Sequence, residues 1–217
     1  MSGEIFISGH SLGGQRAWQY AYSRIKRGLR VDGIYCLAPS KPGNRVIGQV
    51  LFAARAQFQA VRALKNRRDY VPSLPIDMEM IGEQYEQPWR LDEIDEAPSG
   101  PPDLDPDHAI ALYVAGAKKI PDSPGVAIPL GAAADLVARL YVAADGWAWI
   151  SPVSGAYAAV ATLPNGARQA VFRGTQTPLE WLQDFDAAEI DVMGARMPRG
   201  GWAGVAAVQD AMDAALA

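Results

Sequence analysis

The stretch ISGHSLGG (residues 7–14) decides how this sequence is interpreted, because it contains the pattern G-x-S-x-G centred on Ser11. A short apolar, β-prone stretch (residues 4–8) comes before it, and a stretch of helical composition (residues 12–27) follows. This context predicts a sharp turn from a strand into a helix with Ser11 at its apex, where small flanking residues let the helix pass close to the strand. The alternative interpretation is an ordinary Gly/Ser turn before a helix.

A nucleophilic serine needs a general base and a group that orients that base. The chain has two histidines, and His10 lies inside the turn, pointing away from the hydroxyl of its sequence neighbour. His108 is therefore the expected base, and the alternative is a surface histidine near a helix start. Asp69 follows an expected strand (residues 59–64) and is the expected orienting acid, with a loop acid paired to a neighbouring arginine as the alternative. The order Ser, Asp, His is that of α/β-hydrolases.

The composition limits the class of protein. A chain of 217 residues can bury one sizeable core, and 49% hydrophobic with 20% charged residues is ordinary for a soluble globular domain. The net charge of −4 argues against a nucleic-acid partner. Cys36 is the single cysteine, which excludes an intramolecular disulfide and argues against a thiolate-rich metal site. Neither a signal peptide nor a membrane span is visible, so we expect a soluble protein of unknown compartment.

Hydrophobic patterning predicts strands that alternate with helices, which is typical of an α/β fold with a mostly parallel sheet. The expected strands are residues 4–8, 31–39 and 59–64. The expected helices are residues 12–27, 44–58, 108–118, 130–144 and 202–216. A hairpin is expected over residues 156–174, around a Pro-Asn-Gly-Ala turn. Residues 72–107 are rich in Pro, Asp and Glu and are expected to be mostly loop, and residues 118–129 have the composition of a linker.

Further motifs carry a family resemblance. They are GHSLGG, LAPSKPGN (37–44), RRDYVPSLP (67–75), VFRGTQTPLEWLQDF (171–185) and RGGWAGV (199–205). Together they resemble the class 3 (fungal-type) lipase family, which has the α/β-hydrolase fold. In that family a strand ending in FRGT or FRGS, a helix with Trp and Asp, and an H-x-G-F motif come before the nucleophile. Here the matching motifs come after it, with Arg199 at the place of the family's His, which is not a triad residue.

The resemblance therefore implies a circularly permuted α/β-hydrolase domain that covers residues 1–217. Its expected parts are the half with nucleophile, Asp and His (1–117), a permutation linker (118–129), and the half with the oxyanion residue and the lid (130–217). In this order Phe172 should lie on a strand near Ile7, and Ala217 should lie near Met1.

The residues and the resemblance together predict a lipase or esterase that cleaves carboxylic esters through an acyl-enzyme. The backbone N–H of Leu12, the residue after the nucleophile, is one expected oxyanion donor. The resemblance supplies Thr175 as the second donor, with Gln176 and Thr177 as substitutes. It also implies a lid or substrate pocket formed by Leu179, Trp181, Leu182 and Phe185, for which ordinary core packing is the alternative. The acidic loop 76–107 is another candidate for covering the pocket.

No cofactor and no metal are expected. Asp103, Asp105 and Asp107 are closely spaced oxygen ligands, but no glycine turn of a calcium loop follows them. These three acids also crowd His108 too closely in sequence to look like the orienting acid.

The expected partner is a small-molecule ester or a lipid, with no nucleic acid and with transient contact with a lipid interface left open. A monomer is favoured over a domain-swapped dimer, because a linker of about a dozen residues spans roughly 35 Å when extended. A peptidase or an acyltransferase would use the same residues. A non-catalytic binding or structural module that keeps the fold is the alternative from another class.

Overall fold

A computed structural model describes residues 3–66, 69, 89–94, 106–122, 124–141, 148–150, 158–175 and 186–217. Seven strands form one sheet in the order β4-β3-β2-β1-β7-β6-β5. Their bounds are β1 (Ile5–His10), β2 (Gly33–Leu37), β3 (Ala60–Asn66), β4 (Trp89–Ile94), β5 (Ala148–Ile150), β6 (Ala158–Thr162) and β7 (Arg168–Phe172). Six strands run in one direction, and β6 is antiparallel to both of its neighbours. The chain therefore has the α/β fold class, with a mostly parallel central sheet.

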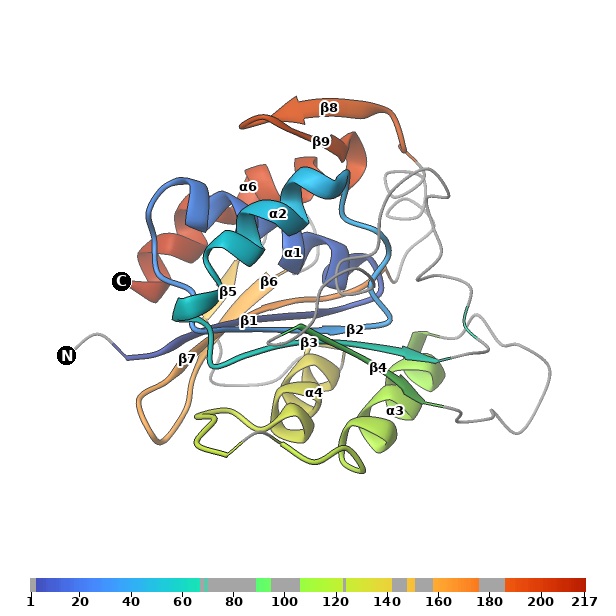
Figure 1. Cartoon of the computed structure of the whole chain (residues 1–217). Coiled ribbons are helices and arrows are strands. Elements are labelled where there is room, and N and C mark those ends of the chain that lie inside the picture. Colours follow the sequence, from blue (N-terminus) through green and yellow to red (C-terminus); the bar gives the residue numbers. More distant parts are fainter. Residues whose placement is uncertain are drawn as a thin grey trace.

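Helices cover both faces of this sheet (Figure 1). One face carries α1 (Leu12–Lys26), α2 (Arg45–Ala53) and α6 (Arg199–Leu216), and the other carries α3 (Pro106–Ala117) and α4 (Leu130–Arg139). The short 3-10 helix η1 (Arg55–Gln57) follows α2, and a separate hairpin contains β8 (Glu189–Val192) and β9 (Ala195–Pro198). Among the described residues, no helix is both long and apolar enough to cross a membrane.

The core has two parts, one on each face of the sheet. Trp18 and Met212 belong to the cluster under α1, α2 and α6, whereas Phe6 and Tyr113 belong to the cluster under α3 and α4. Every residue of β1 is buried because this strand lies in the middle of the sheet with helices on both sides. Buried parallel strands read as nearly continuous apolar runs for this reason.

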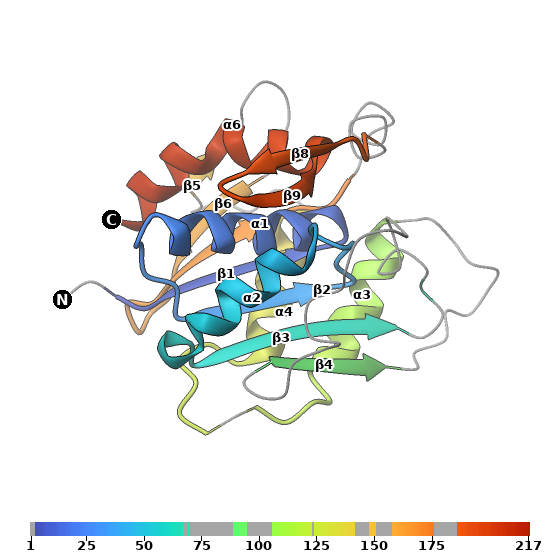
Figure 2. The ribbon, with the colours of Figure 1, turned by 45° about the horizontal axis from the view of Figure 1, so that its top comes forward.

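Strand β7 lies beside β1, as Figure 2 shows. The two strands are parallel, with Ile7 opposite Ala170 and Gly9 opposite Phe172. This pairing confirms the expectation that Phe172 lies on a strand near Ile7.

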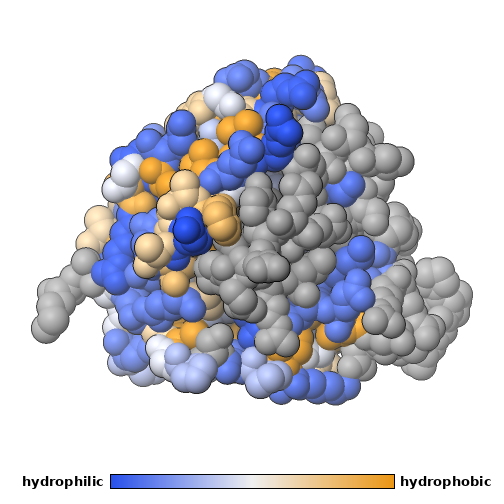
Figure 3. Space-filling view, in the orientation of Figure 1, coloured by the Kyte–Doolittle hydropathy of each residue, from blue (hydrophilic) through white to orange (hydrophobic). Residues whose placement is uncertain are grey.

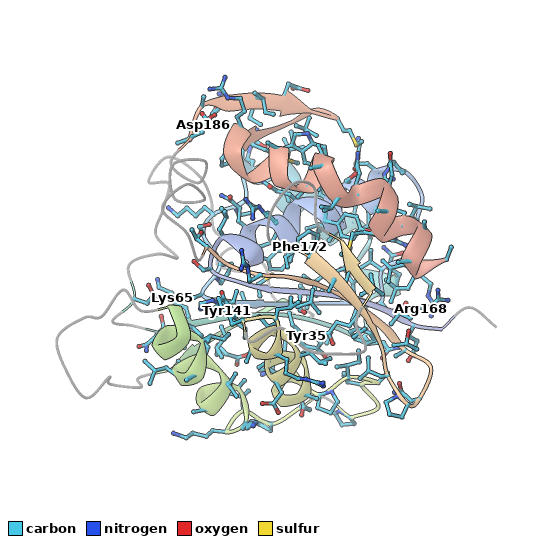
Figure 4. The ribbon with its side chains drawn as sticks, turned by 180° about the vertical axis from the view of Figure 1, so that it is seen from behind. Tyr35, Lys65, Tyr141, Arg168, Phe172 and Asp186 are labelled. Carbon is cyan, nitrogen blue, oxygen red and sulfur yellow. The ribbon has the colours of Figure 1, made fainter. Side chains whose placement is uncertain are left out.

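The end of α6 lies close to the start of β1. The backbone N–H of Arg168 donates to the carbonyl oxygen of Glu4 at 2.7 Å, and Nη2 of the same residue donates to the carbonyl oxygen of Ala217 at 3.4 Å. Figure 4 shows Arg168 on the same side of the molecule as this end of α6. Met1, for which proximity to Ala217 was expected, lies outside the described residues.

Residues 118–129 connect α3 to α4 across one face of the sheet. The Tyr35 hydroxyl donates to the carbonyl oxygen of Ile128 at 2.6 Å, and Nη1 of Arg62 donates to that of Pro121 at 3.0 Å. The carboxylate of Asp122 accepts the N–H of Leu130 at 2.7 Å. The segment expected as a linker is thus tied to β2, β3 and α4.

The prediction that residues 72–107 are mostly loop is wrong for residues 89–94, which form β4 and pair in parallel with β3. The first four residues of this strand, WRLD, alternate apolar and charged residues as a half-buried strand does, but Glu93 interrupts the alternation before Ile94. Strand β4 is the edge strand, and its buried Asp92 accepts hydrogen bonds from Nε and Nη2 of Arg62 on β3 at 2.9 and 2.7 Å. The proline-rich and acidic sequence on both sides conceals this short alternation. Helix α2 also ends earlier than expected, at Ala53 rather than at residue 58.

Candidate active site

Ser11 lies at the junction of β1 and α1 in a sparsely populated backbone conformation, with φ 56° and ψ −126°. A positive φ in a residue other than glycine is strained and costs on the order of 1–3 kcal/mol. The backbone N–H of Ser11 donates to the carbonyl oxygen of Leu37 at 2.9 Å, which fixes the turn against β2. The sequence prediction of a sharp strand-to-helix turn with Ser11 at its apex is confirmed.

The glycines around this turn are required by close backbone contacts. A Cβ atom at Gly9 would lie 2.1 Å from the carbonyl oxygen of Gly13. A Cβ atom at Gly13 would lie 2.3 Å from the carbonyl oxygen of Phe172 on β7. The first turn of α1 therefore packs directly onto the backbones of β1 and β7, where a larger residue has no room.

The expected oxyanion donors lie on the two segments that meet at this turn. Leu12 is the first residue of α1, where backbone N–H groups have no partner within the helix. The other segment follows β7, and a Cβ atom at Gly174 would lie 2.8 Å from the carbonyl oxygen of His10 and 3.1 Å from Cβ of Ser11. Thr175, which is buried, is the next residue. The structure thus brings Ser11, Leu12 and the Gly174–Thr175 segment together.

Asp69 lies just after β3, at the same edge of the sheet, since carboxyl ends of parallel strands share one edge. Its Oδ2 accepts the hydroxyl proton of Tyr113 from α3 at 2.8 Å. The same hydroxyl accepts the backbone N–H of Asn66 at 2.9 Å. Burial, and then the neighbouring Asp69 carboxylate, raises the pKa of Tyr113 well above its usual value, so this hydroxyl keeps its proton and donates it. Sequence reasoning missed Tyr113, since nothing in an Ala-rich helix indicates its partner.

His108, the expected base, belongs to the first turn of α3 by its backbone, and its side chain lies outside the described residues. Helix α3 does reach the nucleophile turn, because the ring centroids of Tyr113 and His10 are 5.7 Å apart. Through Tyr113, the helix that carries the expected base contacts both the expected acid and the turn that carries Ser11.

His10 is unsuited to act as the base. Its ring is buried, and Nδ1 is 2.7 Å from the hydroxyl of Tyr141. Burial lowers the pKa of His10 to about 3, which leaves the imidazole neutral and weakly basic. This environment supports the assignment of the base to the other histidine.

The buried neutral His10 predicts a specific loss of stability in acid. The unfolded chain binds a proton at this residue below its ordinary pKa of 6.5, and the folded chain does so only near 3. The contribution of neutral His10 to the free energy of unfolding is therefore complete above pH 6.5 and is lost as the pH falls. At pH 5 the free energy of unfolding should be lower by about 2 kcal/mol for this reason. Chemical unfolding of the wild type and of His10→Gln at pH 7.5 and 5 measures it as the difference in pH dependence between the two proteins.

An NMR titration of the His10 ring gives an independent check. The ring resonances should stay constant between pH 8 and 5, whereas a titration near pH 6.5 would contradict the prediction.

Several expected site residues lie outside the described residues. They are Gln176, Thr177, Leu179, Trp181, Leu182, Phe185, Asp103 and Asp105, together with the side chain of Asp107. Among the residues that the structure describes, no group of three His, Cys, Asp or Glu side chains could hold a metal ion.

Large hydrophobic side chains are seldom exposed among the described residues. Hydrophobic and hydrophilic residues are interspersed on the face in Figure 3, and Met193 is the single large hydrophobic side chain that is exposed within the described ranges. Contact with a lipid interface gains no support from this part of the surface.

Comparisons with protein-family models, with curated proteins and with solved structures each found no match. The fold and the site by themselves define an α/β protein with a strained serine between the central strand and the following helix.

Proposed function

We propose that this protein is a serine hydrolase that cleaves carboxylic esters through an acyl-enzyme, with Ser11 as the nucleophile. The observation that carries the proposal is the backbone of Ser11, with φ 56° and ψ −126°. Residues held in such conformations cluster at active sites, where the surrounding structure maintains the strain. Here three parallel strands and close-packed glycines hold a serine at a helix N-terminus, a position that stabilises developing negative charge.

The chemistry follows from the residues around this turn. His108 takes the proton of Ser11 as the Ser11 oxygen attacks the ester carbonyl. Asp69 stabilises the imidazolium that forms. The backbone N–H groups of Leu12 and Thr175 stabilise the tetrahedral oxyanion, and each such donor contributes about 3–4 kcal/mol to lowering the barrier. The alcohol leaves with the proton from His108. Water then attacks the acyl-enzyme and gives a proton to His108, which returns it to the Ser11 oxygen as the carboxylic acid leaves.

The fold proposed with this function is that of a single α/β-hydrolase domain in circularly permuted order. Along the chain the nucleophile follows β1, the acid follows β3, and the base begins the helix after β4, which is the order Ser, Asp, His. The strand that carries FRGT is β7, and it neighbours β1 although it comes far later in the sequence. Arg168 joins the end of α6 to the start of β1. Ends that lie close together are what allows a chain to be permuted.

The test is covalent labelling with a fluorophosphonate probe, which reacts with activated serines, followed by mass spectrometry of the labelled peptide. We expect one label per chain, at Ser11, in the wild type and in Ser23→Ala. Ser23 is a buried serine of α1 that hydrogen-bonds Gln209 and serves as a matched control.

A series of p-nitrophenyl esters from short to long acyl chains then identifies the substrate class. A preference for short chains indicates an esterase, and a rise in activity at an interface indicates a lipase. A folded protein that neither reacts with the probe nor hydrolyses any ester would contradict the proposal and favour a binding module.

A further inference from the structure

The hydroxyl of Tyr141 connects the two segments that form the candidate oxyanion site. Tyr141 lies just after α4, and its backbone N–H donates to the carbonyl oxygen of Ala138 at 3.0 Å. Its hydroxyl oxygen accepts the backbone N–H of Gly174 at 3.0 Å. The same oxygen is 2.7 Å from Nδ1 of His10. One side chain that follows α4 thus contacts the residue before the nucleophile and the residue before the second oxyanion donor.

The shape of the site agrees with these hydrogen bonds. A Cβ atom at Gly174 would lie 2.4 Å from the Tyr141 hydroxyl oxygen, so the hydroxyl fills the space that a side chain at residue 174 would need. The rings of His10 and Tyr141 are in edge contact, with centroids 5.8 Å apart. The position of the Gly174–Thr175 backbone relative to the nucleophile turn is therefore set by contact as well as by strand pairing.

Two hydrogen bonds hold the Tyr141 hydroxyl in place. Its oxygen accepts the backbone N–H of Gly174, and it shares a hydrogen bond with Nδ1 of His10 whose direction depends on the imidazole tautomer. The imidazole is neutral because burial lowers its pKa to about 3, so either tautomer keeps the hydroxyl bonded to the ring. Nε2 of His10 is buried and has no hydrogen-bond partner among the described residues.

We propose that Tyr141 is a positioning residue for the oxyanion site: its hydroxyl holds the Gly174–Thr175 backbone in register with the turn that carries Ser11. This inference rests on the proposed hydrolase function. The hydroxyl is used by protein groups on both sides, so it acts on the oxyanion through Thr175 and does not bind the substrate. The effect of its loss therefore falls on kcat.

The matched pair of variants is Tyr141→Phe and Tyr35→Phe. Both tyrosines lie on the face covered by α3 and α4, where Figure 4 labels them. The Tyr35 ring stacks on Phe6, and its hydroxyl donates to the carbonyl oxygen of Ile128, away from the nucleophile turn. Each variant removes one hydrogen-bonded hydroxyl and keeps its ring, so a difference between them reports the role of Tyr141.

With a p-nitrophenyl ester, Tyr141→Phe should lower kcat by about 10- to 100-fold, which is less than the loss of an entire oxyanion donor. Its KM should stay within about threefold of the wild type, because substrate binding does not use the hydroxyl. Tyr35→Phe should keep kcat within about twofold. A higher KM with unchanged kcat in Tyr141→Phe would overturn the inference in favour of a substrate-binding role.

A second measurement does not depend on activity. In protein with ¹⁵N-labelled histidine, only two imidazole rings contribute, and His10 is identified by its absence in His10→Gln. Tyr141→Phe should shift the Nδ1 resonance of His10, because the hydrogen bond between Nδ1 and the hydroxyl is lost, and Tyr35→Phe should leave it in place. An unchanged Nδ1 resonance in Tyr141→Phe would show that the network does not exist and would overturn the inference.

The two proposals fail in different ways. If the wild type hydrolyses esters but Tyr141→Phe has the same kcat as Tyr35→Phe, the positioning role alone is wrong. If the folded wild type hydrolyses no ester and does not react with a fluorophosphonate, the hydrolase function is wrong and the positioning role falls with it, whatever the imidazole spectrum shows.

Discussion

Ser11→Ala is expected to lower kcat for ester hydrolysis by at least about 10⁴-fold, because removal of the nucleophile of a catalytic triad leaves only the contributions of substrate binding and the oxyanion donors. The fold should persist, since the Ser11 side chain makes no capping hydrogen bond to α1. Alanine at φ 56° is as strained as serine, so the free energy of unfolding should change little. Steady-state hydrolysis and chemical unfolding of the same preparations measure the two effects.

A double variant of Ser11 and His108 tests whether the two residues act together. His108→Gln should lose nearly as much activity as Ser11→Ala, and the double variant should lose no more than the larger single effect, because the two residues act as one unit. Ser23→Ala should keep full activity. Independent, additive losses in the double variant would contradict a shared proton transfer, and full activity in Ser11→Ala would exclude this residue as the nucleophile.

Gly13→Ala should destabilise the fold strongly, although alanine is normally about 1 kcal/mol better than glycine inside a helix. The added Cβ would lie 2.3 Å from the carbonyl oxygen of Phe172 and 2.7 Å from backbone atoms of Arg173. Backbone atoms cannot move aside as a flexible side chain can, so α1 must lift away from β7. We expect the free energy of unfolding to fall by about 3–5 kcal/mol, at the high end for single substitutions, together with a loss of ester hydrolysis.

Gly131→Ala is the matched control, because Gly131 is also in the first turn of a helix, α4. A Cβ atom there would lie 3.1 Å from Cγ of Lys118, in an exposed side chain, and 3.6 Å from the Cα atom of the same residue, which is ordinary van der Waals contact. This variant should be as stable as the wild type or slightly more stable. Equal stability of Gly13→Ala and Gly131→Ala in thermal or chemical unfolding would disprove the close approach of α1 to β7.

Much of the fold was predictable because its signals are local. The strand, glycine turn and helix around Ser11 have distinct periodicities, and the hairpin of β6 and β7 is marked by Pro164-Asn-Gly. Strand β4 was missed because only four of its residues alternate between apolar and charged, within a long acidic stretch. The hairpin of β8 and β9 was not predicted either. Its signal in the sequence was Gly194, which lies at the turn with φ 88°.

The candidate site shows the same division between local and long-range signals. Ser11 and Asp69 could be proposed as site residues from their places after expected strands. Tyr113 and Tyr141 could not, because their roles arise from hydrogen bonds to residues 44 and 131 positions away in the chain. A tyrosine in or after an Ala-rich helix reads as ordinary core, and only the packing of that helix against the sheet shows which groups its hydroxyl meets.

The pairing of β1 with β7 also dictates when the site can form during synthesis. Phe172 leaves the ribosome 163 residues after Gly9, its partner across the two strands. Until then one edge of the central strand has no neighbour, and such an unpaired edge is open to association with other chains. Pairing over so long a separation also makes folding slow. The backbone that packs against Gly13 and contains Thr175 is synthesised with β7. The turn that carries Ser11 therefore acquires its final geometry only when β7 pairs with β1.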